Sequence, residues 1–206
     1  MMETIREGIQ VAWEAMTTLE IIAVVLALVY VVLAAREHIA CWPAALGSSL
    51  IYLYLLLQAD LYLESGLQIF YALMAVVGWW AWTHTPASQD AETRPVTMMT
   101  GREHLLSLLV GASFTLGMGY YFSTYTEAAM PYWDAFTTGF ALLTTYWVTM
   151  KKLENWLYWV VIDAVSIYLY FSRELYLSGV LFLVYTIIAV VGYFQWRRAY
   201  LAQAEA

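Results

Sequence analysis

The sequence predicts an all-α integral membrane protein with seven transmembrane helices. Hydrophobic residues make up 63% of the 206 positions and charged residues only 12%, whereas about a quarter of a soluble domain is charged. Seven apolar runs come near the ~20 residues that a helix needs to cross a bilayer. Three of these runs match three others at an offset of 114 positions. We therefore expect two triple-helix units joined by one further helix, a 3+1+3 arrangement.

The segment 1–18 is predicted to form a helix that lies along the bilayer surface. Ile5, Ile9, Trp13 and Met16 fall on one side of such a helix, which is typical of interfacial amphipathic helices. The segment lacks the basic head and apolar core of a cleavable signal peptide.

One long polar loop divides the rest of the chain. This loop, 85–95, is rich in Pro, Ser, Thr and charged residues, and it follows the first predicted unit, 19–84. The linker and a central helix occupy 85–133, the second unit 134–198, and a cytoplasmic tail 199–206. The predicted spans lie at about 19–35, 42–58, 64–84, 104–122, 134–150, 155–171 and 176–196.

The repeat rests on Trp, Tyr and Gly residues, which apolar helices seldom match by chance. Because three is odd, two three-helix units joined directly would have opposite orientations. The unmatched fourth segment makes them parallel, and transporters built from such repeats bind substrate near the membrane midplane. The matched positions are Glu20 with Asp134, Trp42 with Trp156, 54–55 with 168–169, 61–63 with 175–177, Tyr71 with Tyr185, 75–78 with 189–192, and Trp82 with Trp196.

The distribution of Lys and Arg predicts the orientation. Seven basic residues fall on the side reached after odd-numbered spans, and two fall on the other side. We therefore expect the N-terminus outside and the C-terminus in the cytoplasm of a bacterial inner membrane. The predicted cytoplasmic residues are Arg36, Arg94, Arg102, Lys151, Lys152, Arg197 and Arg198, and the outer ones are Arg6 and Arg173.

The start of the sixth span holds the sharpest candidate site. Trp156, Trp159 and Asp163 are spaced i, i+3, i+7 and share one helix face. A carboxylate in lipid is costly unless it faces protein or water, and aromatic plates beside an acid suit a flat cation. Alternatively, the Trp pair anchors the helix at the interface, and Asp163 is protonated or bonded to a neighbouring helix. Asn155 either joins the site or caps the helix.

Polar residues on other spans extend this predicted substrate-binding set. Gln68 and Tyr71 form an i, i+3 pair on the third span, where an amide suits sugar hydroxyls. A helix–helix hydrogen bond is the alternative use of Gln68. Ser49 is the repeat counterpart of Asp163, and Tyr185 is the counterpart of Tyr71.

The remaining patterns give no indication of an enzyme, a metal or a cofactor. The chain has no nucleophile motif and no phosphate loop, and its three histidines have no metal-ligand spacing. A net charge of −7 argues against a nucleic-acid partner, which needs a basic face. Four threonines of the fifth span either line a polar path or let helices approach closely; they are Thr137, Thr138, Thr144 and Thr145.

A set of motifs extends over both predicted units: Trp42-Pro43, Leu61-Tyr62, Gln68 with 78–82, 154–156 with Trp159 and Asp163, and Gly192-Tyr193 with Trp196. The set resembles that of the PnuC vitamin transporters over about 19–198, nearly the whole chain. The Asn-Trp-x-x-Trp element is fairly specific. The chain departs from the family at Ser48-Ser49, where Asn is often found.

This resemblance implies a SWEET-like 3+1+3 fold, a homotrimer, and facilitated diffusion of a non-phosphorylated vitamin that a cytoplasmic kinase traps. Most members are taken to carry nicotinamide riboside, and relatives carry thiamine or riboflavin. We therefore expect a transporter of nicotinamide riboside in the lipid bilayer. Thiamine is the close alternative because its thiazolium is also a cation, and a membrane scaffold or channel is the alternative of a different class.

Overall fold

The structure is a computed structural model that describes residues 2–84 and 94–205 of the chain, and the regular elements within these residues are helices. The predicted linker, 85–95, lies mostly outside the described residues. The helices are α1 (Met2–Ala15), α2 (Thr18–Ala35), α3 (Cys41–Gln58), α4 (Tyr62–His84), α5 (Gly101–Tyr125), α6 (Pro131–Thr149), α7 (Asn155–Ser172) and α8 (Tyr176–Glu205).

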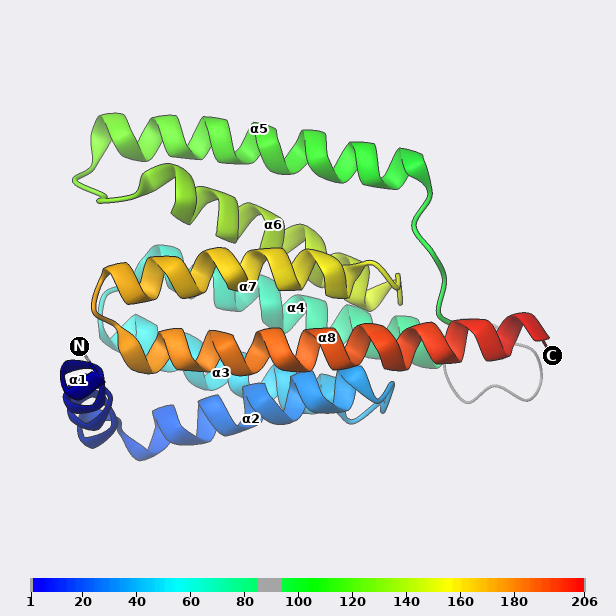
Figure 1. Ribbon diagram of the computed structural model, residues 1–206, viewed down its shortest axis with the longest axis horizontal. Coiled ribbons are helices and arrows are strands. Elements are labelled where there is room, and N and C mark those ends of the chain that lie inside the picture. The colour runs from blue at the N-terminus through cyan, green and yellow to red at the C-terminus, as the bar shows by residue number, and fades with distance from the viewer. Residues whose placement is uncertain (1, 85–93, 206) are drawn as a thin grey trace.

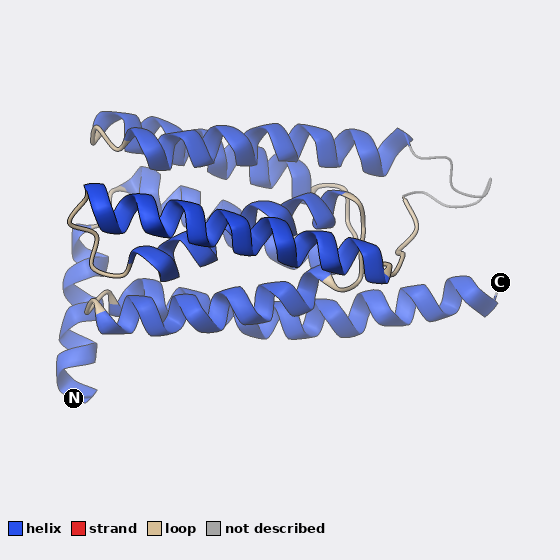
Figure 2. Cartoon of the chain, turned by 90° about the horizontal axis from the view of Figure 1, so that it is seen from above, coloured by secondary structure: helices blue, strands red, loops and turns tan. Residues whose placement is uncertain are grey.

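Helices α2 to α8 run along the long axis of the molecule (Figure 1). Helix α1 lies across one end of this bundle, as Figures 1 and 2 show together, and Gly8 of α1 lies against the ring of Tyr176 at the start of α8. The start of α1 and the end of α8 lie at opposite ends of the bundle. This placement agrees with a helix at a bilayer surface, which stays a prediction.

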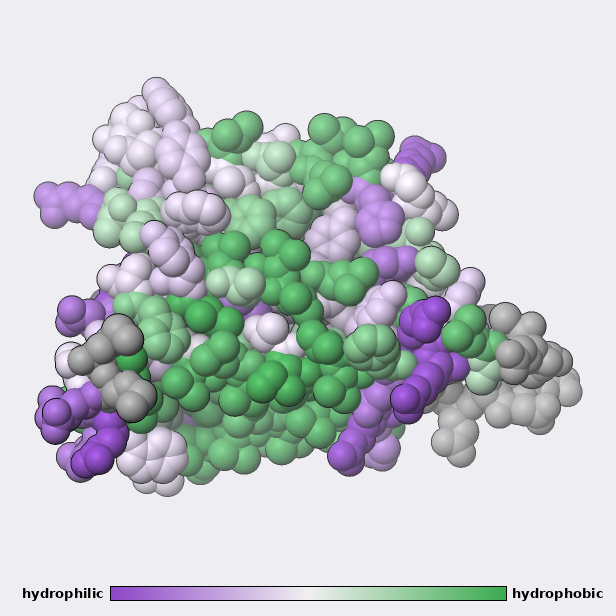
Figure 3. Space-filling view, viewed as in Figure 1, coloured by the Kyte–Doolittle hydropathy of each residue, from purple (hydrophilic) through white to green (hydrophobic). Residues whose placement is uncertain are grey.

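Five helices are long and apolar enough to cross a membrane by length and composition: α2, α3, α4, α5 and α8. Helices α6 and α7 fall outside this group, because threonines and aromatic residues with polar tips replace aliphatic residues in them. Green apolar side chains form a broad band across the molecule, with purple hydrophilic groups near both ends (Figure 3). The all-α prediction is confirmed, and five of the seven predicted spans meet this criterion.

Helices α5 and α8 extend furthest beyond their predicted bounds. Helix α5 begins before residue 104, because Thr100 and Glu103 form a capping box in which the Glu103 carboxylate accepts from the backbone N–H of Thr100 at 2.6 Å. Helix α8 continues through 199–205, which we expected to form a separate tail. That stretch consists largely of Ala, Leu and Gln without Gly or Pro, and these residues favour helix.

The offset of 114 positions also relates the bounds of the helices. Both ends of α3 and α7 differ by this offset, and so do the starts of α4 and α8. The chain leaves α2, α3, α6 and α7 through a left-handed residue and the same pair of backbone hydrogen bonds, a Schellman motif. These residues are Glu37 and Lys151 (φ 58° and 50°) and Asp60 and Glu174 (φ 58° and 60°).

Tryptophans and glycines related by the same offset hold the helices together. The ring of Trp42 covers Gly78, and the ring of Trp156 covers Gly192, at distances that leave no room for a Cβ. Between them, Trp82 and Trp196 pack with ring centroids 6.0 Å apart. Helix α2 packs on α8 and α6 packs on α4, so the interior lies between these two helix pairs, while α5 packs mainly on α6.

Candidate functional site

A cavity of about 460 Å³ lies in the interior of the bundle. Its volume is within the range of small-molecule sites. Helices α2, α3, α4, α6, α7 and α8 line it, whereas α5 and α1 contribute no lining residue. The cavity is therefore built by the six helices that the offset of 114 relates.

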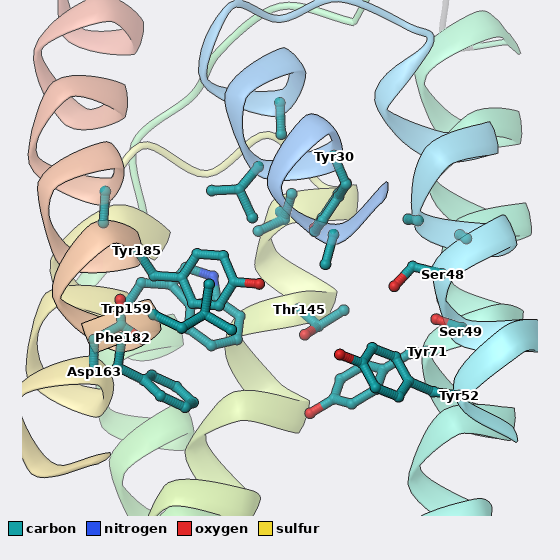
Figure 4. A pocket seen from close by; sticks show the side chains of 18 of the residues that line it. Tyr30, Ser48, Ser49, Tyr52, Tyr71, Thr145, Trp159, Asp163, Phe182 and Tyr185 are labelled. Carbon is teal, nitrogen blue, oxygen red and sulfur yellow. The ribbon is translucent and has the colours of Figure 1, made fainter. Parts of the chain in front are cut away.

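Helix α7 supplies an acid and an aromatic plate. Asp163 and Trp159 both line the cavity, one turn apart on the same helix face (Figure 4). The Asp163 residue is only 2% exposed, and none of the described residues donates a hydrogen bond to its carboxylate. The alternative in which Asp163 is bonded to a neighbouring helix therefore has no support in the described part of the chain. A buried carboxylate without a donor is costly, so it favours a cationic or hydrogen-bonding guest.

Trp156 has a different role from Trp159. Trp156 is 2% exposed, its ring covers Gly192, and it makes an edge contact with Trp196 at 5.4 Å. These contacts occupy the ring, so Trp156 forms part of the cavity wall and is not exposed on the outer surface of the bundle. Trp159 is half-buried, and Figure 4 shows its ring at the edge of the open space. Of the two rings, that of Trp159 is the one open to the cavity.

The facing wall carries hydroxyl and amide groups. Ser49 and Tyr52 come from α3, and Gln68 and Tyr71 from α4. Figure 4 shows Ser49, Tyr52 and Tyr71 across the cavity from Asp163. These groups both donate and accept hydrogen bonds, so this wall is suited to sugar hydroxyls.

Sequence reasoning missed several residues of the cavity. A signal was present, because tyrosines in the middle of apolar helices are amphipathic and need a polar partner or a cavity. Ser48 also lines the cavity, but its hydroxyl is used within the fold, since it donates to the carbonyl of Ala23 at 2.9 Å. The missed residues include Tyr30, Tyr52, Tyr170 and Phe182.

The structure brings seven of the eight predicted site residues to this one cavity. Asn155 lies elsewhere: it is fully buried at the start of α7, and its side-chain amide donates to the carbonyl of Lys152 at 2.6 Å. It therefore neither lines the cavity nor accepts from the backbone N–H groups of α7 as a cap would. The seven that line the cavity are Ser49, Gln68, Tyr71, Trp156, Trp159, Asp163 and Tyr185.

A second cavity, of about 220 Å³, adjoins the first toward the Arg173 end of the bundle. The lining residues that the two cavities share are Tyr71, Trp159, Tyr170 and Phe182. Arg173 donates to the Asp134 carboxylate at 2.7 Å in this second cavity, and this hydrogen bond raises the pKa of Arg173. Both side chains are about one-third exposed. The shared residues indicate a polar path from the Arg173 end to the main cavity.

The predicted threonine path of α6 is only partly present. Thr145 lines the main cavity, and Thr137 and Thr138 line the second one. Thr144 is fully buried, and its hydroxyl has no hydrogen-bond partner among the described residues. The threonines therefore divide between the cavity walls and the helix packing.

A central cavity of mixed polarity inside a bundle of apolar helices defines a class of protein, the multi-pass membrane transporters. The family described as "Nicotinamide mononucleotide transporter" matches residues 17–198. The chain belongs to this family of transporters, and the predicted family is confirmed.

Relatives agree over nearly the full length. The nicotinamide riboside transporter PnuC of Escherichia coli (strain K12) is 21% identical over 212 residues, which cover 92% of this chain and 87% of that protein. The riboflavin/roseoflavin transporter RibM of Streptomyces davaonensis is 24% identical over 174 residues, covering 84% and 81%. The crystal structure of the vitamin B3 transporter PnuC superposes with a TM-score of 0.71 at 20% identity, covering 98% of this chain and 90% of that one. This likeness shows a common fold.

Proposed function

We propose that this chain carries nicotinamide riboside across a bacterial inner membrane by facilitated diffusion, and that phosphorylation in the cytoplasm traps the product. The observation that carries the proposal is Asp163, a buried carboxylate without a donor, beside the half-buried ring of Trp159 in a cavity of about 460 Å³. A pyridinium ring stacked on Trp159 would gain a cation–π contact and neutralise Asp163. The ribose hydroxyls would form hydrogen bonds with the hydroxyls of Ser49, Tyr52 and Tyr71 and with the amide of Gln68.

The charges of the cavity favour a cation without a phosphate. Asp163 supplies an acidic group, whereas no Lys, Arg or His occurs among the described residues that line the cavity. A phosphate group would therefore meet an acid without a compensating base. We infer that the riboside is a better ligand than the mononucleotide for which the family is described. Thiamine, which is also a cation, remains the second candidate, and neutral riboflavin the third.

We also infer seven spans in a 3+1+3 arrangement, with the N-terminus outside. Support comes from the shared offset of α3 with α7 and of α4 with α8, and from the four left-handed helix ends at related positions. In this arrangement α5 joins two parallel units and stays outside the cavity. The family resemblance further suggests a homotrimer, which light scattering of the purified protein in detergent would test.

Calorimetric titration of the purified protein with nicotinamide riboside, thiamine and riboflavin tests the substrate. Aromatic stacking on a flat base is worth about 1–3 kcal/mol, so Trp159→Ala should weaken nicotinamide riboside binding by about 5- to 150-fold. Trp79→Ala is the matched control, because Trp79 is half-exposed on α4 and lies outside the cavity lining. If none of the three vitamins binds or raises the melting temperature, a scaffold or channel becomes the better interpretation.

A further inference from the structure

The main cavity is closed at the end of the bundle near Lys151. The lining residues at this end, Ala34, Trp42, Val148 and Trp156, are each no more than 2% exposed. At the other end, lining residues such as Ser178 are partly exposed, and the second cavity continues the path. A ligand in the main cavity therefore has no route past the Lys151 end in this conformation.

An ion pair lies just beyond this closed end. The ammonium group of Lys151 donates to the Glu37 carboxylate at 2.8 Å, and it lies 4.5 Å from the ring centroid of Trp82. The Lys151 side chain is fully buried and that of Glu37 is 23% exposed. Burial lowers the pKa of Lys151, and the carboxylate of Glu37 opposes this shift.

The two residues occupy equivalent positions of the repeat. They are 114 positions apart, and each is the left-handed residue at the end of its helix, α2 for Glu37 and α6 for Lys151. Equivalent positions of two parallel units come into contact only beside the axis that relates the units. The pair therefore bridges the two units at the axis, on the closed side of the cavity.

The surroundings of Lys151 connect the same two units. Thr97 donates its backbone N–H to the carbonyl of Lys151 at 3.0 Å, and the carbonyl of Thr97 accepts a hydrogen bond from the backbone N–H of Leu153 at 2.9 Å. Arg94 of the same segment donates its backbone N–H to the carbonyl of Trp82 near the end of α4. The segment 94–100 thus fixes the loop that carries Lys151 against the end of the first unit.

The chemistry of the pair suits a contact that must open. A buried ion pair contributes little net stability compared with apolar side chains of similar size. Its advantage at the end of a bundle is that water can solvate both charges when the units part, whereas an apolar contact would oppose opening. We propose that the Glu37–Lys151 pair closes the Lys151 end of the cavity and must break for the ligand to leave there. This proposal rests on the transport function proposed above.

Accessibility of a reporter cysteine tests the proposal. Val148→Cys places a smaller side chain on the closed wall, and Cys41→Ala removes the native thiol. A membrane-impermeant maleimide is applied to vesicles on the Lys151 side, and the labelling rate is measured. We expect Glu37→Gln to raise this rate about tenfold or more, because it removes the carboxylate that pairs with Lys151 across the two units.

Two further variants separate a closing role from a packing role. Glu37→Leu with Lys151→Met replaces the charges by apolar groups and should keep labelling at or below the parent rate. Lys152→Gln breaks the neighbouring pair with Glu103, in which the ammonium nitrogen and a carboxylate oxygen lie 2.9 Å apart, and should leave the parent rate unchanged. Gel filtration and the melting temperature show that each variant is folded.

Labelling of Glu37→Gln at the parent rate would overturn the proposal. So would equally fast labelling of the apolar double variant, because any disturbance of packing would then open the wall. The assay uses no vitamin, so its outcome does not depend on the identity of the substrate. Conversely, a failed vitamin titration leaves the labelling result intact.

Discussion

Replacing Gly78 by alanine should destabilise the protein, because the ring of Trp42 occupies the space that a side chain would need. A Cβ at Gly78 would lie 2.3 Å from the nearest ring carbon, about 1.1 Å inside the 3.4 Å at which ordinary contact begins. Trp42 is 2% exposed and packs edge-on against Trp82 at 5.1 Å, so the ring has no free space to enter. Overpacking of this kind costs about 1–3 kcal/mol, and the size of the overlap favours the upper part of that range. In a chain of this size, each kcal/mol lowers the melting temperature by about 2–4 °C.

The same helix and the repeat provide controls for this substitution. Gly66 of α4 has no atom within 4 Å of an added Cβ, so Gly66→Ala should be neutral or stabilise the helix by up to about 1 kcal/mol. At Gly192, an added Cβ would lie 2.8 Å from the ring of Trp156, so Gly192→Ala should cost less than Gly78→Ala. The measurement is the fraction of purified full-length protein that stays monodisperse in detergent after heating. The reasoning is refuted if Gly78→Ala melts no lower than Gly66→Ala.

Two further predictions concern the transport cycle. Asp163→Asn keeps the shape of the side chain but cannot carry a negative charge. Titration should show nicotinamide riboside binding about tenfold or more weaker, whereas the affinity for neutral riboflavin should change little. Equal losses of affinity for both ligands would rule out the counter-ion role. Vesicles without a kinase, ion gradients or a membrane potential should take up radiolabelled nicotinamide riboside only until the inside concentration equals the outside concentration. Accumulation beyond that level would contradict facilitated diffusion.

The helices were predictable because their signals are local. Apolar runs of about membrane length located the seven long helices, α2 to α8. Most predicted helix ends lie within a few residues of the observed ones. The larger error was at the end of α8, where the polar stretch after Arg198 continues the helix. Polarity indicated the end of the span, but helix propensity determines the end of the helix.

The site was predictable in part because two signals converge on it. Helical spacing put Trp159 and Asp163 on one face, and the repeat identified Ser49 as the counterpart of Asp163 and Tyr185 as the counterpart of Tyr71. Asn155 was misplaced because the spacing gives only its helix, whereas its side-chain amide turns back to the carbonyl of Lys152. The contact of Glu37 with Lys151 depends on how the two units meet, so no local pattern in the sequence points to it.

In the proposed 3+1+3 arrangement, the two related units must differ where they meet at the axis. Identical residues serve well where each unit packs within itself, as Trp42 on Gly78 and Trp156 on Gly192 do. At the axis, equivalent positions meet each other, and two copies of one charged residue would repel. Opposite charges at Glu37 and Lys151 turn that contact into an attraction.

The cavity faces the same constraint, because the proposed ligand has no two-fold symmetry. A vitamin with a charged ring at one end and a sugar at the other needs two different walls. Asp163 on α7 faces its own counterpart, Ser49 on α3, across the cavity (Figure 4). Likewise Gln68 on α4 stands where α8 has Phe182. Divergence at these positions gives one wall charge and aromatic surface and the other wall hydrogen-bonding groups, while the matched Trp–Gly contacts keep both units in the same fold.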